Sequence, residues 1–154
     1  MHRFVVFLIW ALAALPASAQ VPAQPARALA PAASAARDVD PNALAQAALQ
    51  ILQAIDREQA GALWDGASGV TRRSIQRAQF VGQIATARKA LGAPGSRIWT
   101  AVRREGVEQG GELPPGLYAS IEFSSRFQAR AATELVSLRL DEDGRWRFSG
   151  YVIR

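Results

Sequence analysis

Residues 141–153 read DEDGRWRFSGYVI, and they predict a tight turn followed by a final β-strand. Asp143 and Gly144 mark the turn, because glycine adopts positive φ without steric cost and aspartate tolerates it. Beyond the turn, Trp146 and Phe148 share one face, while the arginines beside them share the other. That period of two is typical of a half-buried antiparallel strand. The stretch therefore predicts the second half of a β-hairpin.

The phase of this strand changes after Phe148. Tyr151 and Ile153 fall on the opposite face from Trp146 if the alternation continues unbroken. Gly150 lies between the two sets, and glycine within a strand often marks a bulge or a sharp bend. We therefore predict an irregularity at Ser149-Gly150.

The remaining strands are predicted upstream of the turn. Residues 97–104, 117–127 and 131–140 alternate apolar and polar side chains. A loop rich in glycine and proline, residues 106–116, separates the first two. Within 131–140, Glu134 falls on the same face as the aliphatic residues and should point inward. The sequence therefore predicts a four-stranded antiparallel meander.

Helices are predicted before the strands. Asp40-Pro41 is a favourable start, with aspartate as N-cap and proline in the first turn, and we expect the helix to end or turn at Gly61. A short helical piece over 60–67 and a longer helix from Ser74 or Ala78 to Leu91 follow. This order predicts an α+β domain in which N-terminal helices pack on one face of a curved four-stranded antiparallel sheet.

The chain divides into three parts. Residues 1–19 combine a positive start, an apolar run of about a dozen residues and an Ala-Ser-Ala end, which is typical of an export signal. An uncleaved N-terminal anchor is the alternative. Residues 20–38 are rich in Ala and Pro and predict a disordered linker. Residues 39–154 remain as a single domain. We therefore expect a periplasmic or secreted protein with no stable membrane span after signal cleavage.

Cysteine and histidine contribute no side chains to the predicted mature protein. The chain has no cysteine, and its one histidine, His2, lies in the predicted signal. Catalysis by Ser-His-Asp or Cys-His groups and structural zinc sites are thereby excluded for the mature protein. We predict no metal and no organic cofactor. The acids at 141–143 lack the ligand spacing of a calcium loop, and they predict a solvated turn.

Carboxylates, tyrosines and arginines are the remaining groups with useful chemistry. Nothing in the spacing of the acids selects a catalytic pair. An inward Glu134 needs a partner, and we expect an arginine from a neighbouring strand. Asp65 is a second candidate for a buried acid.

The excess of basic residues is carried almost wholly by arginine. The chain has 18 Lys+Arg against 13 Asp+Glu and a net charge of +5. An arginine-rich face could bind an anionic envelope component. A GC-rich genome produces the same excess whatever the function, and we take that compositional explanation as the default. Nucleic-acid binding is not predicted, because export would remove that partner and no recognition motif is present.

A pocket between helices and sheet is the second candidate binding region, for a small ligand. Its aromatic residues are expected by default to serve the core, since a small domain needs large side chains for burial. The candidate pocket or binding residues are Trp64, Ser68, Tyr118, Glu134, Arg139, Trp146 and Tyr151.

Several segments resemble the bacterial family known as domain of unknown function 4019 (DUF4019). The resemblance runs from about Asn42 to Ile153. It is most specific in Trp64 with Ala67-Ser68 and in DGRWR followed by SGY at 143–151. It implies a small exported domain of cystatin-like or NTF2-like shape and brings no catalytic residues. Ala62-Leu63 departs from the pattern, where an aromatic residue is expected.

Two functions follow from these observations. The first is a non-catalytic binding or structural module. The alternative is a hydrolase- or isomerase-like enzyme that uses carboxylate, Tyr and Arg groups in a helix–sheet pocket. A deep pocket beside Glu134 or Asp65 would favour the enzyme, and a filled interior would disfavour it.

Overall fold

The computed structural model describes residues 39–154. The predicted signal, residues 1–19, and the predicted linker, residues 20–38, lie outside the described residues and stay predictions.

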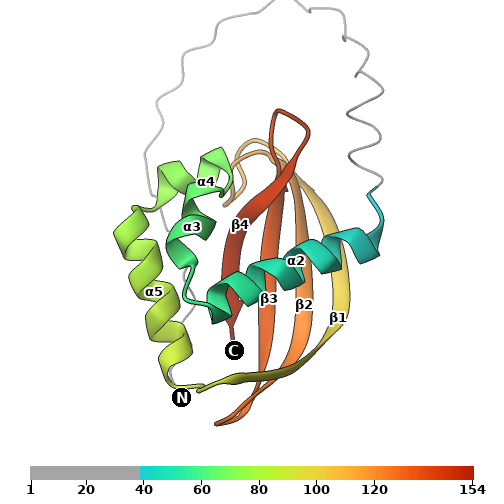
Figure 1. The fold of residues 1–154 in the computed structure, drawn as a ribbon. Coiled ribbons are helices and arrows are strands. Elements are labelled where there is room, and N and C mark those ends of the chain that lie inside the picture. The colour runs from blue at the N-terminus through green and yellow to red at the C-terminus, as the bar shows by residue number, and fades with distance from the viewer. Residues whose placement is uncertain (1–38) are drawn as a thin grey trace, which may run out of the picture.

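Helices come first and strands second, as predicted (Figure 1). The sheet is antiparallel throughout, in the order β1-β2-β3-β4. The α+β prediction is therefore confirmed. The elements are α2 (Pro41–Asp56), α3 (Ala60–Asp65), α4 (Gly69–Ser74), α5 (Arg77–Lys89), β1 (Pro94–Val107), β2 (Gly116–Phe127), β3 (Ala131–Leu140) and β4 (Trp146–Ile153).

Helix α2 begins where the sequence predicts. The Asp40 side chain accepts a hydrogen bond from the backbone N–H of Asn42 at 2.9 Å, and Pro41 occupies the first turn. Its end differs from the prediction. The helix stops at Asp56, and Glu58 takes a left-handed φ of 61°. Gly61 does not end this helix but lies within α3.

Helix α4 is missed by the sequence prediction, which places the next helix start at Ser74 or Ala78. The local cause is a cap. The Ser68 hydroxyl accepts a hydrogen bond from the backbone N–H of Thr71 at 3.2 Å, which stabilises a short helix. Extended backbone at Ile75 then separates α4 from α5.

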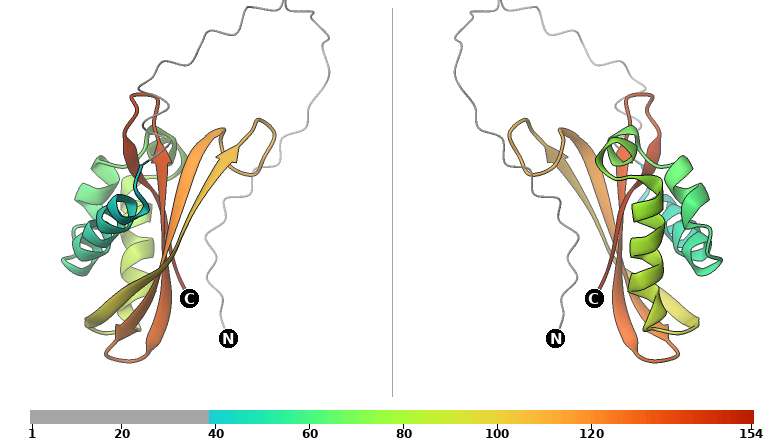
Figure 2. Two further views of the ribbon diagram at one scale, coloured as in Figure 1. Left: turned by 90° about the vertical axis from the view of Figure 1, so that its right-hand side faces the viewer. Right: turned by 90° about the vertical axis from the view of Figure 1, so that its left-hand side faces the viewer.

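Within residues 39–154, the four helices lie on one side of the sheet, and none of them covers the other side (Figure 2). α2 crosses the strands obliquely, and α5 runs beside β4 (Figure 1). The interior between the two layers is filled by aliphatic and aromatic side chains. The principal members are Leu44, Ala48, Leu52, Ile55, Phe80, Ile84, Ala119, Ile121, Phe123, Val136, Leu138 and Phe148.

The irregularity predicted in the last strand is confirmed, and it lies at Ser149. Leu138 pairs with Phe148, whereas the preceding Ser137 pairs with Gly150. Ser149 is therefore the extra residue of a β-bulge. The bulge shifts the alternation by one, so Tyr151 faces the helices together with Phe148.

Candidate functional site: a buried ion-pair network

Five polar side chains from five different elements meet at the end of the helix–sheet interior. Asp56 is the last residue of α2, and Arg88 lies in the last turn of α5. Arg97 comes from β1, Glu134 from β3 and Tyr151 from β4. We refer to these five residues as the ion-pair network.

Glu134 is the centre of the network, and its side chain is fully buried, with 0% exposure. Its Oε1 atom accepts hydrogen bonds from Arg88 Nη1 at 2.6 Å and from the Tyr151 hydroxyl at 2.7 Å. Its Oε2 atom accepts one from Arg97 Nε at 2.6 Å. Both oxygens are thus occupied by charged or hydroxyl donors, which is the condition for burying a carboxylate stably.

Asp56 closes the network on the side of α2. Its Oδ2 accepts a hydrogen bond from Arg97 Nη1 at 2.6 Å, and its Oδ1 accepts one from Arg97 Nη2 at 2.9 Å. Arg88 also donates to Asp56. Each arginine therefore bridges the same two acids. The guanidinium carbons of Arg88 and Arg97 lie 4.7 and 5.6 Å from the centroid of the Phe127 ring, which adds cation–π attraction.

The surroundings fix the protonation of Arg97 and Tyr151. Burial alone lowers the pKa of Arg97, but the hydrogen bonds that Arg97 donates to Asp56 and Glu134 outweigh it and leave that pKa raised. Burial raises the pKa of the Tyr151 hydroxyl, and the negative charge of Glu134 raises it further. Tyr151 is therefore a proton donor to Glu134 and a poor general base. The arrangement suits the joining of secondary-structure elements better than the transfer of protons.

Glu134 was predicted to face inward with an arginine partner, and the structure confirms both expectations. The expected source of the arginine is wrong. β3 pairs with β2 and β4, whereas the partners come from β1 and from helix α5. Arg88 lies in the last turn of α5, where a cation also suits the helix dipole, so its position in the sequence does not reveal its long-range role. Asp56 is the last residue of α2, and its position at a helix end gives no sign of this role.

A second group of predicted residues lies on the opposite face of the sheet. Arg139 is 6% exposed and pairs with Tyr118 in the strand register. Its Nη1 donates to Asp141 at 2.9 Å, and its Nη2 donates to the Pro115 carbonyl at 3.0 Å. The Tyr118 hydroxyl donates to the Pro114 carbonyl at 2.8 Å. These contacts hold the loop before β2 against the β3–β4 hairpin.

The turn that opens β4 is held by further ion pairs. Gly144 has a left-handed φ of 77°, and its N–H donates to the Asp141 carbonyl at 2.9 Å. Arg147 donates to Asp143 at 2.6 and 2.7 Å. This hydrogen bonding holds the pKa of Asp143 down at about 2. The predicted solvated acidic turn is thus a turn whose acids are neutralised by arginines.

Three more predicted site residues, Trp64, Ser68 and Trp146, make contacts that stabilise the fold. The Ser68 N–H donates to the Phe148 carbonyl at 2.8 Å, which fixes α4 against the edge of β4. Trp64 Nε1 donates to the Ile75 carbonyl at 3.0 Å. Trp146 is half-buried and packs against the core. The predicted site residues therefore fall into separate groups and do not line one pocket.

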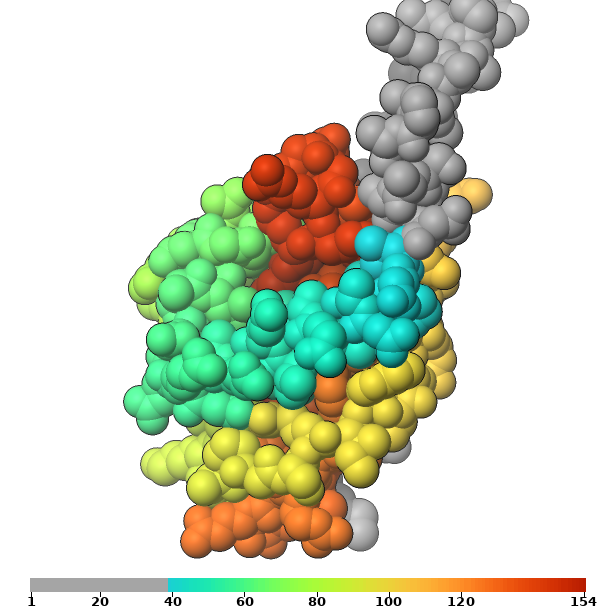
Figure 3. Space-filling view, turned by 45° about the vertical axis from the view of Figure 1, so that its right-hand side comes forward, coloured from blue at the N-terminus to red at the C-terminus, as the bar shows by residue number. Residues whose placement is uncertain are grey.

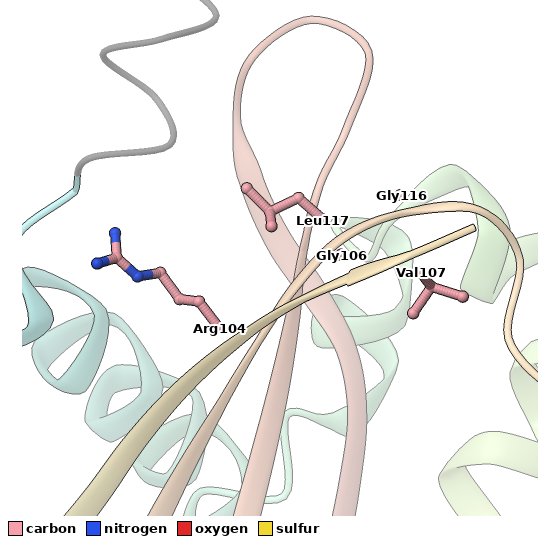
Figure 4. A pocket seen from close by; sticks show the side chains of 5 residues that line it. All are labelled: Arg104, Gly106, Val107, Gly116 and Leu117. Atoms are coloured by element: carbon pink, nitrogen blue, oxygen red, sulfur yellow. The ribbon is translucent and has the colours of Figure 1, made fainter.

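A shallow hollow of about 490 Å³ lies elsewhere, at the rim of the sheet, lined by Arg104, Gly106, Val107, Gly116 and Leu117. Arg104 and Val107 lie on opposite faces of β1 in the register with β2, as Figure 4 shows. The hollow therefore opens around the end of the strands and not between helices and sheet. It contains none of the predicted site residues.

No group of three or more His, Cys, Asp or Glu side chains within residues 39–154 is arranged to hold a metal ion. No helix among those residues combines the length and apolar character that crossing a membrane requires.

Comparison with protein families identifies a match that covers most of the chain. The model of the family described as "Protein of unknown function (DUF4019)" matches residues 47–151. The matched region includes every member of the ion-pair network. No curated protein matches the chain.

Proposed function

Because the chain belongs to the DUF4019 family, which brings no assigned reaction, we propose its function from the geometry: an exported, non-catalytic binding or structural module that meets its partners through its surface. The observation that carries this proposal is the state of Glu134. Both oxygens of this buried acid are occupied by Arg88, Arg97 and Tyr151. An acid–base catalyst needs a carboxylate that can reach a substrate.

The enzyme alternative loses support at both of its candidate acids. Glu134 is enclosed in the ion-pair network. Asp65 is more than half exposed and pairs with Arg77 at 2.9 Å, which is an ordinary surface arrangement. The core residues that fill the space between helices and sheet leave the surface as the place for recognition.

Ion pairs within the domain reduce the number of arginines that are available to bind an anionic partner. Many of the arginines that could have met an anionic partner are in ion pairs within the domain. These are Arg77, Arg88, Arg97, Arg139, Arg147 and Arg154. An anionic envelope polymer would therefore bind weakly, through surface charges and with a strong dependence on salt.

Thermal unfolding with two kinds of probe tests the non-catalytic proposal. A small apolar dye represents pocket ligands, and polyphosphate represents anionic polymers. We expect the dye to leave Tm unchanged and polyphosphate to raise it slightly at low salt, with the effect lost at about 0.15 M salt. A saturable rise of several degrees with the apolar dye would contradict the filled interior and return the pocket to consideration.

Export is tested separately. We expect the protein recovered from the periplasm or culture medium to begin near Gln20, as N-terminal sequencing would show. An intact Met1 in a membrane fraction would support the uncleaved anchor instead.

A further inference from the structure

The two edge strands of the sheet, β1 and β4, differ in how far the helices cover them. At the β4 edge, the carbonyls of Phe148 and Ser149 accept hydrogen bonds from Ser68 and Thr71, so α4 covers that edge. At the β1 edge, α2 passes over the helix-facing side only (Figures 1 and 2). An uncovered edge presents unpaired backbone N–H and C=O groups to any strand that fits.

β1 is irregular in its first half and regular in its second. Its register with β2 shifts between Trp99 and Ala101, so Thr100 is a bulged residue. From Ala101 to Val107 the register then continues without interruption. The regular segment has Arg104 at its midpoint, and Arg103 to Gly106 are exposed (the yellow strand in Figure 3).

We propose that the regular segment of β1, residues 101–107, pairs antiparallel with the same segment of a second copy of this chain. The two-fold axis passes at Arg104, and the two sheets continue into one. The closed symmetry makes each contact occur twice. This inference does not depend on the proposed function, because it concerns self-association and not ligand binding.

The register follows from the faces of the strand. Residues that lie opposite each other across a pair of strands share a face. The axis must therefore pass through a residue and not between two. A two-fold axis at Arg103 or at Glu105 would place that charged residue opposite its own copy on the uncovered face of the sheet, so that like charges would meet.

An axis at Arg104 gives complementary pairs instead. It sets Arg103 opposite Glu105 of the second copy, on the uncovered face, and Ala101 opposite Val107. Arg103 and Glu105 are both exposed, and neither has an ion-pair partner within residues 39–154. Charges on an edge strand ordinarily oppose pairing. Here their spacing makes the edge attractive to its own copy.

Arg104 itself would meet its own copy at the axis. Its Nη1 atom donates to the Val39 carbonyl at 3.4 Å, on the helix-facing side. This contact draws the guanidinium toward the start of α2. The charge at the axis is thereby kept away from the pairing backbone.

Analytical ultracentrifugation of the purified protein tests the proposal. We expect a reversible monomer–dimer equilibrium between about 10 µM and 1 mM, the range of weak association. R103E and E105R should each weaken dimerisation at least about tenfold, since each substitution makes both symmetric pairs repulsive. A mixture of R103E with E105R should associate again, because opposite charges then meet at both positions.

A matched control separates this geometry from general attraction between oppositely charged variants. R126E changes an exposed arginine of β2 by the same charge, away from the β1 edge. It should leave dimerisation unchanged, and adding E105R to it should give no heterodimer stronger than the R126E homodimer. Circular dichroism melts would verify that each variant is folded. A wild-type protein that stays monomeric to about 1 mM, or a mixture of R103E and E105R that does not associate, would overturn the proposal.

Discussion

Arg97 and Glu134 are joined across an intervening strand, with Arg97 Nε 2.6 Å from Glu134 Oε2. The two residues belong to β1 and β3, and β2 lies between them. Arg97 reaches over the helix-facing surface of β2 and at the same time bonds to Asp56 of α2. One side chain thus connects the first described helix, the edge strand and a central strand.

This relationship predicts a large effect for Glu134→Gln. The substitution keeps the shape of the side chain but leaves Arg88 and Arg97 with less negative charge than their burial requires. We expect a loss of about 3 kcal/mol in the free energy of unfolding, as for other broken buried ion pairs. Urea titration measures it.

Glu122→Gln is the matched control for that measurement. Glu122 pairs with Arg154, whose side chain is 67% exposed. Its loss should cost less than about 1 kcal/mol, because surface pairs contribute little. Equal effects of the two substitutions would show that the buried network adds nothing beyond a surface pair.

The raised pKa of the Tyr151 hydroxyl leads us to expect a loss of stability in alkaline solution. Its pKa in the folded protein is raised above the ordinary value of 10.0. The folded state therefore holds the phenolic proton more tightly than the unfolded state does. The resulting stabilisation is fully present below about pH 10 and is lost as the pH rises above it. We expect denaturant unfolding to show this decline.

Tyr151→Phe is the variant that isolates the effect. It removes the titrating hydroxyl and its bond to Glu134, so it should be less stable than the wild type at pH 8 and should decline less above pH 10. A parallel decline in both proteins would assign the alkaline effect to other groups.

Phe148 and Trp146 share a strand face and predict different costs of truncation. Phe148 is 3% exposed and meets the Phe80 ring edge-on, with centroids 5.6 Å apart. Phe148→Ala should cost about 3–5 kcal/mol, as is usual for buried aromatic residues. Trp146 is half-buried, so Trp146→Ala should cost less. The reverse order in urea titrations would show that Trp146, and not Phe148, anchors the hairpin.

The fold could be predicted from the sequence because its signals are local. Turn residues such as Asp143 and Gly144, alternation in the strands and a capped start at Asp40 each act over a few residues. The network could not be predicted, since Asp56 and Arg97 are 41 residues apart and no periodicity links them. Helix α4 was missed because one serine cap determines it.

The bulge at Ser149 joins these two levels, and its deletion is the most specific test of the structure. Removing Ser149 would place Gly150 directly after Phe148 and restore plain alternation, so Tyr151 would still face the helices and keep its 2.7 Å bond to Glu134. We expect a loss of about 1–3 kcal/mol in the free energy of unfolding, since the Thr71 hydroxyl loses the Ser149 carbonyl that accepts its hydrogen bond at 3.1 Å. The same deletion should leave the pKa of Tyr151 raised, because the ring keeps its burial and its contact with Glu134, and tyrosinate absorbance would report this. Deleting Gln109 from the β1–β2 loop shortens the chain equally and should cost less than about 1 kcal/mol. A Tyr151 whose pKa returned toward its ordinary value without Ser149 would show that the bulge itself, and not the alternation after it, places the ring.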